Sequence, residues 1–194
     1  MTTGRMEAFS DGVIAIIITV MVLELKVPHD PTPAALRPVL PPLLTYAFSF
    51  LNVGIYWNNH HHMLHATSRI NGGVLWANLH LLFWLSLIPF TTGWMGENHF
   101  QPVPTAVYGL VLLLSSIAYY ILARSLLAAE GPGSKLAAAI GSDVKGRIST
   151  LIYLAAVPLA FVRPWMAIAL YVLVSLIWLV PDRRIERRIE EPRG

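Results

Sequence analysis

The chain has 194 residues, of which 55% are hydrophobic and only 13% are charged, whereas a soluble domain usually carries about 25% charged residues. A membrane-spanning helix needs about 20 residues, so six spans would occupy about 120 residues and leave about 74 for every loop and tail. These numbers exclude a second, soluble catalytic domain and predict an all-α polytopic membrane protein. The absence of cysteine also excludes disulfides, thiolate metal sites and cysteine nucleophiles.

Six apolar stretches follow one another along the chain, and we predict that they form a single domain over residues 1–194. The predicted spans cover about 5–27, 39–66, 70–95, 104–125, 146–162 and 164–181, followed by a tail at 182–194. The last two spans are short, and the Arg163-Pro164 break separates them, because the residue before a proline disfavours the helical conformation.

The basic residues predict the orientation of these spans. Of the 14 Lys and Arg residues, all but Lys26, Arg37 and Arg163 lie in the termini, the second loop or the fourth loop, which six spans place on one side of the membrane. The positive-inside rule therefore predicts that both termini are cytoplasmic. This topology explains the basic net charge of +3 without nucleic acid, which we do not expect as a partner.

Two acidic residues bracket the apolar part of the first span. Only 12 uncharged residues separate Asp11 from Glu24, too few to cross about 30 Å of hydrocarbon. The helix must therefore bring at least one acid toward the membrane, where ionisable groups face a bundle interior or a water-filled path. Alternatively, Ser10 or Asp11 caps the helix at the interface, where the helix dipole favours an acid.

An aliphatic stripe follows these polar residues. Ile16, Val20 and Leu23 recur at i, i+4 and i+7 and so share one helix face, with Thr19 beside them. Without further information, such a stripe indicates a packing surface.

The second span ends in a group of histidines, His60 to His62 and His65. The one-turn spacing of His61 and His65 suits a metal ion, but an aromatic and histidine belt at the membrane interface is the simpler explanation and the one we favour. We expect no metal and no cofactor. Some of these histidines could also be partners of Asp11.

The third span contains two polar residues, Asn78 and His80, which are expected to bond to neighbouring helices. Pro89, further along the same span, is expected to kink the helix. No nucleophile–base–acid arrangement and no phosphate-binding loop is present in the sequence, so we do not expect an enzyme.

Together these segments resemble a known family. The pattern Arg5-x-x-x-Phe9-Ser10-Asp11 at the start of the first span is similar to the signature of the transmembrane protein 175 family of potassium channels, in its prokaryotic single-repeat branch. The second and third spans resemble that family through Tyr56-Trp57, His60-His61 and Asn78-Leu79. The resemblance covers roughly the first 95 residues.

The resemblance implies a homotetramer in a prokaryotic plasma membrane, with six helices per subunit and potassium as the permeant ion. The first helix of each subunit would line the pore. Rings of Ile16, Val20 and Leu23 would narrow that pore, with Ile16 as the tightest point, and the Thr19 hydroxyl would contribute to selectivity.

The resemblance also implies a structural role for the signature residues. They would tie the first helix to the second and third helices, and the residues concerned are Arg5, Phe9, Ser10, Asp11, Trp57, His61 and Asn78.

Two other functions compete with a channel. A proton-coupled secondary transporter could use Asp11, His60, His61 and His80 as a relay. A metal-dependent membrane enzyme could be built on the histidines from His60 to His65. Neither has a family resemblance behind it.

Overall fold

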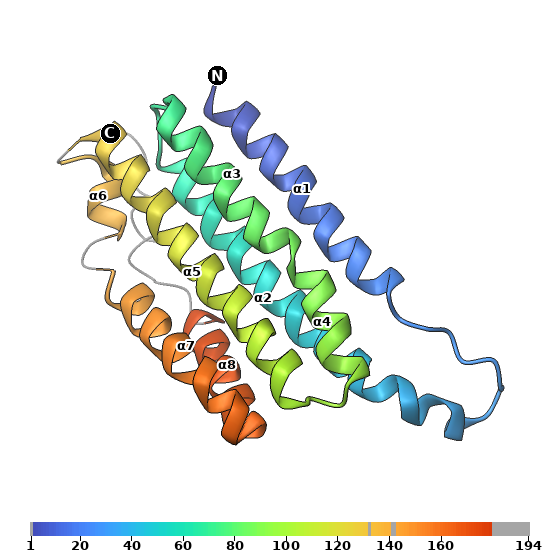
Figure 1. Ribbon diagram of the computed structural model, residues 1–194. Helices are drawn as coiled ribbons and strands as arrows, with labels where there is room; N and C mark the ends of the chain where they lie inside the picture. The colour runs from blue at the N-terminus through green and yellow to red at the C-terminus, as the bar shows by residue number, and fades with distance from the viewer. Residues whose placement is uncertain (1, 132, 141–142, 180–194) are drawn as a thin grey trace.

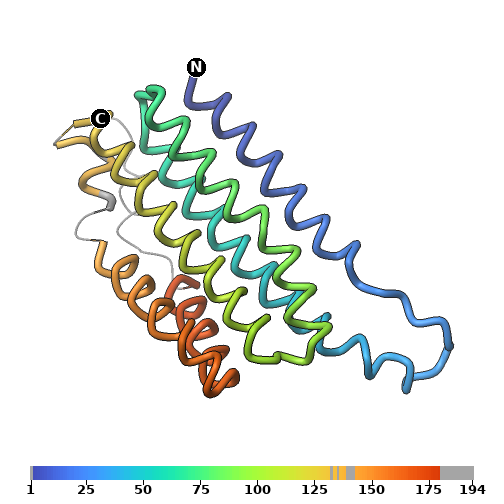
Figure 2. Tube along the Cα trace, viewed as in Figure 1, coloured from blue at the N-terminus to red at the C-terminus, as the bar shows by residue number. Residues whose placement is uncertain are grey.

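A computed structural model describes residues 2–131, 133–140 and 143–179. All regular structure within these ranges is helical (Figures 1 and 2). The elements are α1 (Thr3–Leu23), the short 3-10 helix η1 (Pro33–Val39), α2 (Leu40–His65), α3 (Gly72–Ser86), α4 (Ile88–Glu97), α5 (Pro102–Glu130), α6 (Lys135–Ile140), α7 (Val144–Val162) and α8 (Pro164–Leu179).

Within the described ranges, five helical stretches are long and apolar enough to cross a membrane. They are Thr3–Leu23, Pro33–His65, Gly72–Glu97, Pro102–Glu130 and Val144–Val162, and the shorter apolar helix α8 follows them. In Figure 1, α1, α2, the α3–α4 pair and α5 run side by side as an antiparallel bundle. The prediction of an all-α polytopic membrane protein is confirmed.

The helix bounds differ from the predicted spans at several ends. Helix α1 ends at Leu23, four residues before the predicted end, and a loop runs from there to η1. Helix α5 is longer than predicted at both ends, and the six-residue α6 was not predicted. The tail predicted at 182–194 and the last two residues of the sixth predicted span lie outside the described residues.

Pro89 divides the third predicted span into two helices. Helix α3 ends at Ser86 and α4 begins at Ile88, with Pro89 in its first turn. Proline has no N–H to donate, and its ring clashes with the carbonyl four residues earlier. The chain closes the break locally, because the Leu87 carbonyl accepts from the Thr91 N–H at 3.1 Å.

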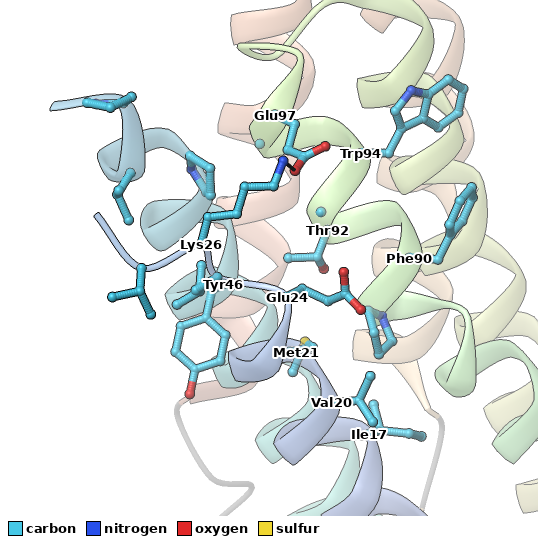
Figure 3. A pocket seen from close by; sticks show the side chains of 18 of the residues that line it. Ile17, Val20, Met21, Glu24, Lys26, Tyr46, Phe90, Thr92, Trp94 and Glu97 are labelled. Atoms are coloured by element: carbon cyan, nitrogen blue, oxygen red, sulfur yellow. Dashed lines mark ion pairs between the residues drawn. The ribbon is translucent and has the colours of Figure 1, made fainter. Parts of the chain in front are cut away.

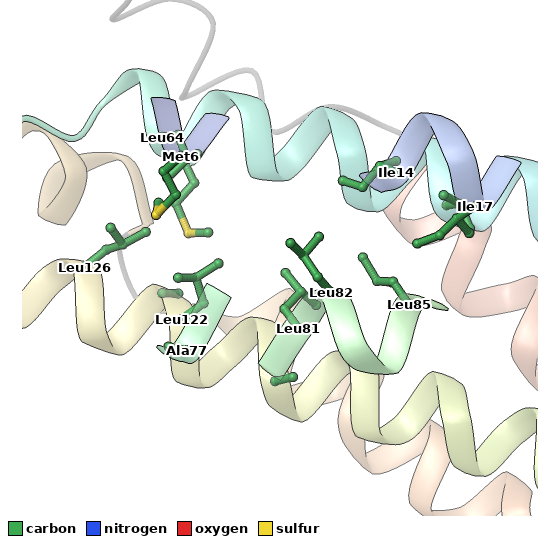
Figure 4. Packing of buried hydrophobic residues seen from close by; sticks show 14 of the residues in the cluster. Met6, Ile14, Ile17, Leu64, Ala77, Leu81, Leu82, Leu85, Leu122 and Leu126 are labelled. Atoms are coloured by element: carbon green, nitrogen blue, oxygen red, sulfur yellow. The ribbon is translucent and has the colours of Figure 1, made fainter. Parts of the chain in front are cut away.

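Two hydrophobic clusters share α5 as a common wall. The first joins α1, α2, α3 and α5 and includes Met6, Ile14, Ile17, Leu64, Leu81, Leu82, Leu85, Leu122 and Leu126 (Figure 4). The second joins α5, α7 and α8 around Tyr108, Tyr153 and Tyr171. Because the first cluster packs against one side of α1 only, it determines which face of α1 remains exposed.

Gly109 lies at a close contact between α5 and α8. A Cβ built on Gly109 would lie 1.9 Å from the hydroxyl of Tyr171. Tyr171 is fully buried, and its hydroxyl donates to the Thr105 carbonyl at 3.2 Å. We expect Gly109→Ala to lower the free energy of unfolding by about 1–3 kcal/mol, because overpacking displaces a ring that has no free space.

Thermal unfolding in detergent measures this effect, and Gly54→Ala is the matched control. A Cβ on Gly54, also inside a helix, meets no atom within 4 Å. That variant is expected to melt at or slightly above the wild-type temperature, since alanine favours the helix. Equal melting temperatures for the two variants would contradict the packing argument.

Candidate functional site

Helix α1 has two faces of different character. Its buried face consists of Met6, Ser10, Ile14, Ile17 and Met21. Its other face exposes large apolar side chains, namely Phe9 (50% exposed), Ile16 (64%), Val20 (36%) and Leu23 (75%). The stripe that the sequence spacing places on one helix face is therefore exposed, and Ile16 and Val20 also line a hollow whose other walls include η1 and α4.

Thr19 lies next to this stripe and is exposed. Its hydroxyl donates to the Ala15 carbonyl one turn earlier, at 2.9 Å. The donated proton leaves the oxygen lone pairs available as acceptors, so Thr19 can offer an oxygen ligand at an otherwise apolar surface.

A buried polar cluster fixes the buried face of α1. Asn78 Nδ2 on α3 donates to Ser10 Oγ at 2.9 Å, and Asn78 Oδ1 accepts from His60 Nε2 on α2 at 2.8 Å. All three side chains are buried. One asparagine thus joins α1, α2 and α3, and it sets the rotation of α1 about its own axis.

A second set of contacts joins α1 to α2 nearer the surface. Trp57 Nε1 donates to Asp11 Oδ1 at 2.9 Å. One helical turn away on both helices, His61 Nδ1 lies 2.8 Å from Glu7 Oε1. The helices are antiparallel, so residues four positions earlier on α1 meet residues four positions later on α2. His61 therefore pairs with Glu7, a residue that the sequence analysis did not select.

The remaining signature residues have no comparable contact. The side chain of Arg5 is exposed and makes no hydrogen bond or ion pair with any residue that the structure describes. Phe9 points its ring to the exposed face of α1.

The groups of the relay alternative are distributed over separate contacts. His60 bonds to Asn78, Asp11 to Trp57, and His61 to Glu7. His80 is exposed and accepts from its own neighbour Trp84, at 2.9 Å. No continuous hydrogen-bonded chain joins these four groups within the described residues.

A hollow of about 1140 Å³ lies between the second half of α1, η1 and α4. Its wall includes Val20, Glu24 and Phe90, and Figure 3 shows Lys26 reaching Glu97 across one side. The Lys26 ammonium and the Glu97 carboxylate are 2.7 Å apart and exposed. The hydrogen bond with Glu97 raises the pKa of Lys26 above its ordinary value, so the Lys26 ammonium keeps its charge.

Asp11→Ala tests the contact between α1 and α2. It leaves the Trp57 indole N–H without an acceptor, and we expect a loss of about 1–2 kcal/mol. This is less than a fully buried hydrogen bond to a charge would give, because Trp57 is partly exposed. Asp11→Asn keeps an oxygen acceptor and should lose less. Melting temperatures in detergent measure both, and an Asp11→Ala protein as stable as wild type would contradict a structural role.

The helices and their contacts define a multi-pass membrane protein whose first helix has a buried polar anchor and an exposed apolar face. The sequence model of a family described as "Endosomal/lysosomal potassium channel TMEM175" matches residues 5–89. A protein named potassium channel from Chryseobacterium sp. (strain P1-3) is 55% identical over 98% of this chain and 100% of its own length. Another of that description, from Streptomyces collinus, is 32% identical over 91% of each chain.

The fold of the chain also matches that of a solved structure. The crystal structure of a lysosomal potassium-selective channel TMEM175 homologue from Chamaesiphon minutus has a TM-score of 0.76 and 28% sequence identity, and the match covers 94% of this chain and 97% of that one. The chain belongs to the transmembrane protein 175 (TMEM175) family, as the sequence resemblance predicted. The family is described as a channel and not as an enzyme class.

Proposed function

We propose that the chain forms a potassium-selective ion channel, with α1 of each of four subunits lining a shared pore. The observation that carries this proposal is the exposed apolar face of α1, where Ile16 is 64% and Leu23 75% exposed. Ser10 lies on the buried side of the same helix, where the cluster with Asn78 holds it inside the bundle. The names of the relatives and of the matched structure support the choice of potassium.

A single stripe cannot enclose a pore, so the channel needs copies of the chain related by rotational symmetry. In a homotetramer, each of Ile16, Val20 and Leu23 forms a ring of four side chains around the axis, with Ile16 as the narrowest. The six predicted spans then form one channel domain per subunit. The channel lies in a prokaryotic plasma membrane, and both termini are cytoplasmic, as the positive-inside count indicates.

Such a pore resists ions because its walls provide no ligand for a cation that must shed water, and it can close by dewetting. Potassium holds its water less tightly than sodium, so a narrow apolar ring favours potassium. Thr19, beside the stripe, supplies an oxygen that can replace part of the hydration shell. The lipid bilayer and other copies of the chain are its partners, and the channel needs no cofactor.

Recordings from planar bilayers test this function. With potassium on one side and sodium on the other, single-channel currents should appear, and they should reverse near the potassium equilibrium potential. A flux that saturates, requires a proton gradient and shows no single-channel events would instead favour the secondary transporter. The mass of the purified protein in detergent, measured by light scattering, should correspond to four chains.

A further inference from the structure

A cluster of potential metal ligands lies where α1 and α2 meet, outside the apolar stripe. Among the residues that the structure describes, Glu7, His61 and His65 form a group whose ligand atoms all lie within 4.8 Å of one another. Glu7 and His61 are partly buried, and His65 is exposed. The sequence pattern shows only the pair of His61 and His65. The third member of the cluster, Glu7, is acidic and lies on α1.

The geometry of the three side chains suits one ion. His61 and His65 are one turn apart on α2, the spacing that presents two imidazoles on one helix face, and their ring centroids are 5.4 Å apart. Glu7 Oε1 already lies 2.8 Å from His61 Nδ1. The indole of Trp57 stacks on the His61 ring with 6.0 Å between centroids, which restricts the orientation of that imidazole.

We infer that Glu7, His61 and His65 form a binding site for a divalent transition metal of the Zn²⁺ type, which links α1 to α2. Two imidazoles and one carboxylate are zinc ligands, at about 2.0–2.2 Å from the ion. Small side-chain rotations bring ligand atoms within 4.8 Å of one another onto such an ion, and the exposure of His65 gives it a path in. Mg²⁺ and Ca²⁺ prefer oxygen ligands and do not fit this set.

The simpler arrangement is an ion pair between Glu7 and His61 with no ion bound. A substitution of His65 distinguishes the two arrangements, because His65 takes no part in the ion pair but is the third ligand of the metal site. Since His65 is exposed at the end of α2, His65→Gln leaves the fold intact. This makes it the decisive variant.

Equilibrium dialysis against Zn²⁺, with detergent-purified protein carrying a tag without histidine, tests the site. Wild type should bind about one Zn²⁺ per chain, with the fourth coordination position left to water. His65→Gln and Glu7→Gln should each weaken binding at least about tenfold, since even outer-shell partners of a metal account for 10–100-fold. His80→Gln, which alters an exposed histidine outside the cluster, should bind like wild type, and Mg²⁺ should not compete.

Two results would overturn the site: no stoichiometric Zn²⁺ on the wild-type chain, or His65→Gln binding as tightly as wild type. A second readout is the melting temperature, which Zn²⁺ should raise for wild type but not for His65→Gln, because an ion that binds only the folded chain stabilises it. Neither measurement depends on ion conduction. An effect of Zn²⁺ on current would rest on the proposed function, so failure of the channel and failure of the metal site remain distinguishable.

Discussion

Ile16→Asn is expected to raise single-channel conductance and to weaken the selectivity for potassium over sodium. Ile16 is the most exposed of the stripe residues in the middle of α1, and in the proposed pore its side chains form the narrowest apolar ring. An amide in that ring offers a ligand to a partly dehydrated cation and keeps the constriction wet. Lowering the barrier by about 1.4 kcal/mol would increase the rate of permeation about tenfold.

Val22→Asn is the matched control for this experiment. Val22 is also an exposed aliphatic residue of α1, with 43% exposure, but it lies about 120° around the helix from Ile16 at 3.6 residues per turn. The Val22→Asn substitution should leave conductance and selectivity unchanged. Bilayer recordings with potassium and sodium on opposite sides measure both quantities. If a folded Ile16→Asn tetramer shows wild-type conductance and selectivity, the assignment of Ile16 to the selectivity filter is wrong.

The parts of the molecule that follow from local patterns could be predicted from the sequence. Long apolar stretches predict membrane helices because the bilayer allows few other structures, and the helical period places Ile16, Val20 and Leu23 on one face. Pro89 predicts a kink because it lacks an N–H, and the structure divides the span into α3 and α4 near this residue. The family followed from the signature that begins at Arg5, and that identification is confirmed.

The pairing of side chains between helices could not be predicted in the same way. It depends on the axial register and rotation of α1 against α2, which packing sets and the sequence period does not. A register fixed by Asp11 and Trp57 brings Glu7 to His61, yet nothing local to Glu7 indicates this. For the same reason, the sequence could propose Asn78 as a bonding residue without showing that it joins both Ser10 and His60.

The double contact of Asn78 also gives a large expected effect on stability, of the same size as that of Gly109→Ala. Asn78→Leu keeps the size of the side chain but removes the acceptor for His60 Nε2. The other ring nitrogen of His60 already has no partner among the described residues, so a fully buried imidazole would be left without any hydrogen bond. An unpaired buried polar group costs about 1–3 kcal/mol, which corresponds to roughly 2–4 °C in melting temperature per kcal/mol for a chain of this size.

A double-mutant cycle separates this effect from a general disturbance of the core. His60→Leu combined with Asn78→Leu removes both partners, and replacing a buried hydrogen-bonded pair by apolar groups can be nearly neutral. The double variant should therefore recover most of the stability that Asn78→Leu loses, with Ser10 still donating to the Met6 carbonyl at 2.8 Å. If the losses of the two single variants simply add, the His60–Asn78 bond contributes nothing specific. If they couple, the bond to His60 helps to hold Asn78 in the position from which it donates to Ser10 on α1.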